Sequence, residues 1–207
     1  MSRRFAELAF TPPVKEQQVQ HGSRHLYERI EHSPDSGDRL GPYEQGFIQA
    51  RDGFYKASVS ETGWPYIQYR GGLPGFLRVV NDQTLGLADL RGNRQYISTA
   101  NLLHDDRVAL FLMDYPAQSR LKILGHAKVL EGDAEAEALI EKLRVPEEKT
   151  PPERAILIRI EGFDWNCPQH ITPRYTEAEL TEILAPMRVR LEALEAENQR
   201  LRAATAK

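Results

Sequence analysis

Residues 84–115, TLGLADLRGNRQYISTANLLHDDRVALFLMDY, contain four segments whose order decides the fold. An apolar strand-like run, TLGLADL, ends beside the polar turn RGNRQ, and residues 95–105 then place their apolar side chains at helical spacing. Ser98, Thr99 and Asn101 are candidates for the cap of this helix. The closing run, RVALFLMDY, is continuously apolar and of strand length, which predicts a central strand buried on both faces. The stretch therefore predicts strand, turn, helix and strand.

The segments on either side are also typical of an antiparallel β protein. FIQA and FYKASVS are expected strands, and FYKASVS is followed by a turn at residues 61–63 and by PYIQYR, the pattern of a hairpin. FLRVV, a turn at Asn81-Asp82 and TLGLADL predict a second hairpin. Farther on, RLKILGHAKVLEG and RAILIRIEGFDWN are expected strands, separated by the amphipathic helix DAEAEALIEKLRV. Roughly six or seven strands with few helices predict a mainly β (α+β) chain, an antiparallel barrel with peripheral helices.

Composition narrows the class of protein. The 207 residues are 41% hydrophobic and 28% charged, as in soluble globular proteins with a substantial core. The net charge of −3 does not favour nucleic acid as a partner. A single cysteine, Cys167, excludes an internal disulfide and favours the cytoplasm, and no apolar run is long enough for a signal peptide or a membrane span. No GxGxxG, P-loop or Gly-x-Ser-x-Gly sequence occurs.

The last segment, residues 176–207, carries a heptad pattern that predicts a short parallel dimeric coiled coil. A single Asn at an a position favours two strands in register, and the charges at positions e and g are complementary. Because proline is tolerated only in the first turn of a helix, we expect the coiled helix to begin near Pro186. The alternative is an amphipathic helix packed on its own domain. The seam consists of Leu184, Leu191 and Asn198 at a, and Met187, Leu194 and Leu201 at d.

The order of these segments resembles the FMN-binding split barrel of the pyridoxamine 5′-phosphate oxidase-like superfamily over residues 47–175. The most specific part runs from residue 84 to residue 132 and includes Gly125-His126-Ala127 near the end of a strand. Two departures matter. Gly71-Gly72-Leu73-Pro74-Gly75 follows Arg70, and the core ends in FDWNCPQHITPRY, with no recognisable set of residues for pyridoxyl phosphate. The chain is thus more similar to the flavin-nucleotide-binding group than to the true oxidases.

The resemblance implies a homodimer that holds FMN in clefts at the subunit interface. Guanidinium groups and turn amides suit the phosphate dianion of FMN, Gly92 lets the backbone approach it, and the following helix N-terminus adds a favourable dipole. The dimer would form through the barrel face and the coiled coil. By the resemblance, Arg70 would lie near the flavin or its phosphate, and Arg120 matches a family position that reaches FMN. Lys122 is added because β alternation puts it on the same face as Arg120. The phosphate-side turn would be formed by Asp89, Arg91, Asn93, Arg94 and Gln95.

A second polar stretch, DWNCPQHITPR, offers candidates for the flavin ring or the substrate. We expect Trp165, Asn166, Gln169 and Arg174 to lie on the ring side, with His170 as the candidate catalytic residue. The alternative is a buried loop held by Trp165 and Pro168. One cysteine and one histidine do not make a metal site, so we expect none. His21 and His25 are expected surface residues.

These observations predict an FMN-binding flavoprotein, an FMN-dependent oxidoreductase acting on a small molecule. The alternatives are a non-catalytic flavin-binding or flavin-sensing module, and a dimeric interaction protein without flavin. The predicted organisation is a helical or irregular segment at 1–46, the FMN-binding domain at 47–175 and the C-terminal helix at 176–207.

Overall fold

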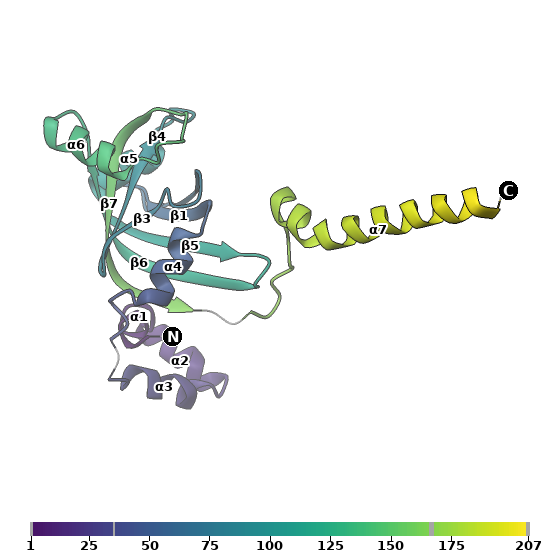
Figure 1. Cartoon of the computed structure of the whole chain (residues 1–207). Coiled ribbons are helices and arrows are strands. Elements are labelled where there is room, and N and C mark those ends of the chain that lie inside the picture. Colours follow the sequence, from purple (N-terminus) through teal and green to yellow (C-terminus); the bar gives the residue numbers. More distant parts are fainter. Residues whose placement is uncertain (1, 35, 166–167, 206–207) are drawn as a thin grey trace.

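A computed structural model describes residues 2–34, 36–165 and 168–205 of the chain. Its centre is an open, curled antiparallel sheet of seven strands in the order β2-β1-β5-β6-β7-β4-β3 (Figure 1). The predicted fold class is confirmed: this is an antiparallel split barrel with peripheral helices, although the sheet does not close. The strands are β1 (Gly53–Val59), β2 (Pro65–Gly71), β3 (Arg78–Asn81), β4 (Thr84–Leu90), β5 (Arg107–Asp114), β6 (Ser119–Leu130) and β7 (Pro152–Trp165).

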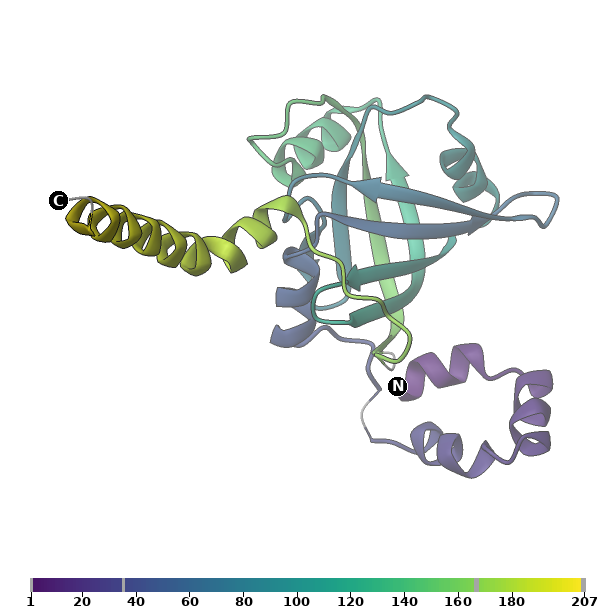
Figure 2. The ribbon, with the colours of Figure 1, turned by 90° about the vertical axis from the view of Figure 1, so that its right-hand side faces the viewer.

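Helices flank the sheet at both ends. The first three lie together at one end of the barrel, and the fifth and sixth lie near the other (Figures 1 and 2). No helix within the described ranges is long and apolar enough to cross a membrane. The helices are α1 (Arg3–Ala9), α2 (Pro12–Gln20), α3 (Arg24–Glu31), α4 (Pro42–Gln49), α5 (Ile97–His104), α6 (Ala134–Leu143) and α7 (Glu177–Thr205).

Both predicted hairpins are present, β1–β2 and β3–β4, but the predicted strand FIQA is wrong. Instead, residues 47–49 form the end of α4, and Ala50 is its C-cap. Pro42 stands in the first turn of α4, and the Glu44 carboxylate accepts a hydrogen bond from the Gly41 amide at 3.0 Å. Both features start a helix, and the short apolar pair Phe47-Ile48 fits either kind of element. Ile48 is fully buried in the barrel core.

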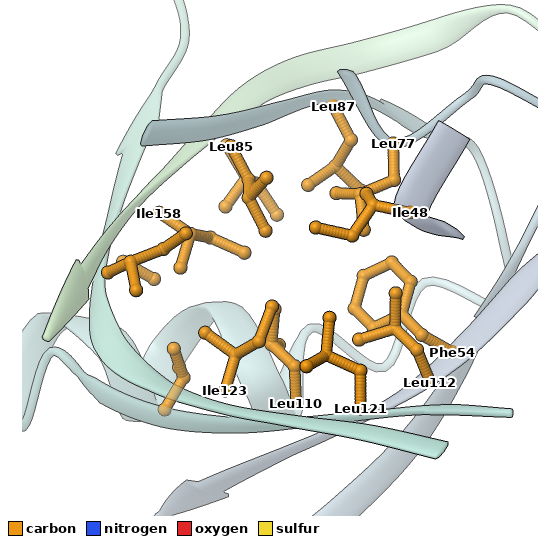
Figure 3. Close-up of a cluster of buried hydrophobic side chains, with 14 of the residues drawn as sticks. Ile48, Phe54, Leu77, Leu85, Leu87, Leu110, Leu112, Leu121, Ile123 and Ile158 are labelled. Atoms are coloured by element: carbon orange, nitrogen blue, oxygen red, sulfur yellow. The ribbon is translucent and has the colours of Figure 1, made fainter. Parts of the chain in front are cut away.

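The expectation that β5 is buried on both faces is also wrong for the single chain. Its inward side chains, such as Leu110 and Leu112, are buried, whereas Phe111 and Met113 on the other face are only half-buried. The inward residues join a core built from both halves of the sheet and from α4 (Figure 3). The outer face of β5 therefore stays partly open to solvent.

The C-terminal helix begins earlier than the sequence predicted and does not pack on the barrel. It starts after Thr176, whose hydroxyl accepts from the Glu179 amide at 3.2 Å while the Glu179 carboxylate accepts from the Thr176 amide at 2.7 Å. This capping box starts a helix that continues through Pro186. No described residue of α7 is buried, and Figure 1 shows it extending away from the sheet. The alternative of a helix packed on its own domain is thus contradicted.

Candidate functional site

A cleft of about 340 Å³ opens where β2, β4 and β7 meet the turn before α5. Six of the eight residues predicted to bind the cofactor line it. Its lining includes Gln68 and Arg70 of β2, Asp89 of β4, Arg154 of β7, Ser98 of α5, and Arg91, Gly92, Asn93, Arg94 and Gln95 of the turn. The structure thus brings together residues that are distant in the sequence.

The wall of the cleft carries a buried ion-pair network around Asp89. Its carboxylate lies 2.6 Å from Arg70 Nη1 and 3.5 Å from Arg154 Nη1, and the residue is only 2% exposed. Burial raises the pKa of Asp89, and the nearby cations Arg70, Lys56 and Arg154 oppose that shift. Arg70 and Arg154 therefore approach the same buried carboxylate from two different strands.

Arg154 links this network to the surface. It donates to Glu131 at 2.8 Å and to Glu153 at 3.0 Å, and its guanidinium lies 5.0 Å from the centre of the Tyr96 ring. The carboxylates raise the pKa of Arg154 against the effect of its burial. Arg154 thereby ties β7 to the residue that precedes α5.

The turn at residues 91–95 is exposed and adopts an unusual backbone conformation. Arg94 (φ 61°) and Tyr96 (φ 54°) are both left-handed, a region that costs a non-glycine residue on the order of 1–3 kcal/mol. Such strained residues cluster at ligand sites. Arg94 Nε donates to the Tyr96 hydroxyl at 3.4 Å, and the Gln95 amide donates to Asn93 Oδ1 at 3.2 Å. The left-handed Tyr96 stands at the N-cap of α5, so Ser98, Thr99 and Asn101 are not its cap, contrary to prediction.

Buried polar atoms around the cleft lack partners within the chain. Among the residues that the structure describes, Lys56 Nζ, Gln68 Oε1, Arg70 Nε and Ser98 Oγ are buried and make no hydrogen bond. Each buried polar atom left unpaired costs roughly 1–3 kcal/mol, so such atoms are normally paired with protein, water or ligand. Their grouping fits a ligand with several acceptor atoms and at least one donor. A flavin mononucleotide has both.

Arg120 and Lys122, the other two predicted FMN contacts, lie away from this cleft on β6. Their side chains share a face of the strand, as alternation predicted. Lys122 Nζ lies 2.9 Å from Asp164 Oδ2, and the Arg120 guanidinium lies 5.8 Å from the centre of the Phe111 ring. Their contact with a cofactor stays a prediction.

Those residues predicted on the flavin-ring side that the structure describes also lie outside the cleft of their own chain. Trp165 packs on α4 and donates from Nε1 to Glu44 at 2.8 Å. Gln169 and His170 are exposed, and the Arg174 guanidinium lies 5.2 Å from the centre of the Tyr115 ring. Asn166 and Cys167 lie outside the described residues. Pro168 is exposed, so the alternative of a buried loop does not hold there.

Sequence reasoning missed Lys56 and Arg154. Residues 54, 56 and 58 face inward on β1, but Tyr55, Ala57 and Val59 on the other face are the more apolar set, so the pattern indicated the wrong face as buried. For Arg154 a signal existed. It stands at every second position with Ile156, Ile158 and Ile160, so strand alternation puts all four side chains on the same inward face. No cluster of three or more side chains able to hold a metal ion occurs among the described residues.

The family model of pyridoxamine 5′-phosphate oxidase matches residues 44–164. No curated protein matches the chain. Among solved structures, a putative pyridoxamine 5′-phosphate oxidase from Lactobacillus delbrueckii is 20% identical with a TM-score of 0.48, covering 61% of this chain and 94% of its own. HupZ of Group A Streptococcus is 16% identical with a TM-score of 0.48, covering 66% and 99%.

HutZ, a heme storage protein from Vibrio cholerae, is 18% identical with a TM-score of 0.40, covering 61% of this chain and 94% of its own. These TM-scores lie below 0.5, and none of the three neighbours determines the ligand of this chain.

Proposed function

Because this chain belongs to the pyridoxamine 5′-phosphate oxidase family, matched over residues 44–164, we propose that it binds FMN in the cleft between β2, β4 and α5. The observation that carries the proposal is the convergence of Arg70, the turn at 91–95 and unpaired buried polar atoms on one cleft. When bound, FMN would supply hydride or electron transfer to a small-molecule substrate. The protein would act as an FMN-dependent oxidoreductase.

The residues of the cleft divide the work of binding. The exposed turn with Arg91 and Arg94 is the phosphate-binding part, since guanidinium groups and turn amides bind phosphate strongly. Where a Cβ would stand on Gly92, no atom lies within 4 Å, so a ligand can approach that backbone. The amides at the start of α5 add the favourable end of a helix dipole. Arg70, held by Asp89, is the fixed cation of the deeper wall.

The experiment is to purify the protein, record its visible spectrum and identify any released chromophore by mass. We expect FMN at about one molecule per chain. Arg94→Ala should weaken FMN binding roughly tenfold to a hundredfold, the value of a charge-assisted hydrogen bond. Arg29→Ala is the matched control, because Arg29 is an exposed arginine on α3. Unchanged FMN affinity of Arg94→Ala, or release of a heme in place of FMN, would contradict the proposal.

We extend the proposal to a homodimer. An apolar groove of about 530 Å³ lies on the outer face of the sheet, lined by Tyr55, Ile67, Phe111 and Met113 among others, and a second barrel would bury it.

His170 lies outside the cleft of its own chain, so a catalytic role for it would act in the partner's cleft. Catalysis is separated from flavin sensing by whether bound FMN is reduced and reoxidised by a small molecule in turnover.

The heptad seam of α7 offers a matched pair of variants for the coiled coil. Leu191 occupies an a position and is 57% exposed, whereas Val189 lies outside the seam and is 66% exposed. We expect Leu191→Lys to weaken dimerisation in sedimentation experiments, and Val189→Lys to leave it unchanged. Equal behaviour of the two variants would argue against pairing through this seam.

A further inference from the structure

Lys56 is a buried cation without a counter-ion bond, and it stands beside the cleft. The residue is 1% exposed, and its Nζ makes no hydrogen bond to any part of the chain that the structure describes. An ammonium group taken out of water is costly unless it is paired. The free protein thus keeps a destabilising group at this position, which a purely structural role does not explain.

Lys56 does not itself line the cleft, but its position in the sheet makes it a neighbour of residues that do. On β1 it faces inward with Phe54 and Ser58, and its register partner on β2 is Gln68, which lines the cleft. The next inward position on β2 is Arg70. Lys56 Nζ, Gln68 Oε1 and Arg70 Nε are all buried and unpaired within the described chain. Three unpaired polar atoms therefore stand together on the inner face of one hairpin.

The groups around Lys56 identify its electrostatic role. Arg70 of β2 repels it and Asp89 of β4 attracts it, while Leu110, its register partner on β5, and Asn101 of α5, which donates to Ser58, are uncharged. Asp89 is already ion-paired with Arg70 at 2.6 Å. Burial and Arg70 lower the pKa of Lys56 to about 8. At pH 7 the ammonium form of Lys56 therefore still predominates, and a nearby anion or acceptor atom would stabilise it further.

We propose that Lys56 is a ligand-binding residue of the cleft, whose ammonium group donates to a negatively charged or acceptor oxygen of the bound flavin nucleotide. This inference rests on the proposed function. The shared chemistry is an oxygen acceptor, and FMN offers two sources: its phosphate and the carbonyl edge of its ring. Lys56 would act as a positioning residue for the cofactor, and its buried charge would be satisfied only in the complex.

The first test compares Lys56→Met with the wild-type protein in two measurements of opposite expected sign. Methionine keeps most of the volume and removes the charge, so the free variant should melt a few degrees higher. Its affinity for FMN should fall roughly tenfold to a hundredfold, because a hydrogen bond to a charged donor is lost. Lys128→Met is the control, since Lys128 is exposed on β6 and should change neither quantity.

The second test is the pH dependence of FMN binding between pH 7 and pH 9, where the FMN phosphate has completed its ionisation (pKa about 6). If ligand binding requires the protonated Lys56, wild-type affinity should fall above pH 8, by at most about tenfold per pH unit for one linked proton. The affinity of Lys56→Met should not change in this way. Riboflavin, which lacks the phosphate, separates the two sources: an equal loss with riboflavin assigns the ring edge, and a loss with FMN alone assigns the phosphate.

The outcomes are distinct. If the wild type binds FMN and Lys56→Met binds it equally well at every pH, this inference is overturned while the proposed function stands. If the wild type binds no FMN, the proposed function fails first, and this inference fails with it.

Discussion

Replacing Arg154 with methionine keeps much of the side-chain volume but removes a guanidinium that serves three carboxylates. The free-energy cost of leaving each carboxylate without its guanidinium partner depends on how well water can reach that carboxylate. The Glu131 side chain is 54% exposed and can be rehydrated, whereas the Asp89 side chain is 3% exposed and cannot. Asp89 retains Arg70 at 2.6 Å, which limits the loss. With one or two buried charge-assisted hydrogen bonds lost, we expect a free energy of unfolding lower by about 2–4 kcal/mol.

For a chain of this size, each kcal/mol corresponds to about 2–4 °C, so the melting temperature should fall by about 4–16 °C. Urea unfolding followed by tryptophan fluorescence measures the free energy directly, and an unchanged m-value would show that only stability has changed. The comparison variant is Glu131→Gln, which removes the exposed partner and should cost less than about 1 kcal/mol. If Glu131→Gln costs as much as Arg154→Met, burial does not set the strength of this network and the reasoning is refuted.

Two further predictions concern stability away from the cleft. In Gly125→Ala, the new methyl group would meet the backbone oxygen of Arg159 at the bulge in β6, so we expect a loss of about 1–3 kcal/mol in urea unfolding. Gly46→Ala on α4 meets open space and should be neutral or stabilising by up to about 1 kcal/mol; the reverse order would contradict the packing. The hydrogen bond from Arg24 lowers the pKa of Glu31 from 4.5 to about 2. Because the pKa of Glu31 is lower in the folded state, the stability from this pair should be present above pH 4.5 and disappear as the pH falls toward 2. Acid-unfolding titrations should show this pH dependence in the wild type and not in Glu31→Gln.

The sequence predicted the hairpins because their strands alternate around clear turns, and it predicted a turn between β4 and α5 because small and polar residues cluster there; that this turn binds phosphate stays a prediction. It failed where local signals were ambiguous. Phe47 and Ile48 suit a strand or a helix equally, and only the cap at Glu44 and the contact with the core decide for α4. The preference of proline for a first turn predicted a helix start near Pro186, but the capping box at Thr176 already starts the helix.

The candidate site was predicted in part for a similar physical reason. Residues close together in the turn could be grouped from sequence, whereas the ion-pair network requires knowledge of which strands are neighbours. Arg154 meets Asp89 only because β7 pairs with β4 in register. Lys56 is buried because β1 turns the face with Phe54 and Ser58 inward, whereas the alternation in the sequence favours burial of the more apolar opposite face.

The exposed position of α7 has a consequence for how unfolding of this protein is observed. A helix with no buried side chain, joined to the barrel only at one end, is stabilised by its own hydrogen bonds and, in the proposed dimer, by pairing with its partner. It can lose its helical structure while the barrel remains folded, and the proposed pairing would make the temperature of this step depend on protein concentration. Residues 177–205 contain no aromatic side chain, so far-ultraviolet circular dichroism would detect this early step and tryptophan fluorescence would not. A mismatch between the two signals would then report the melting of the tail, and not an intermediate of the barrel.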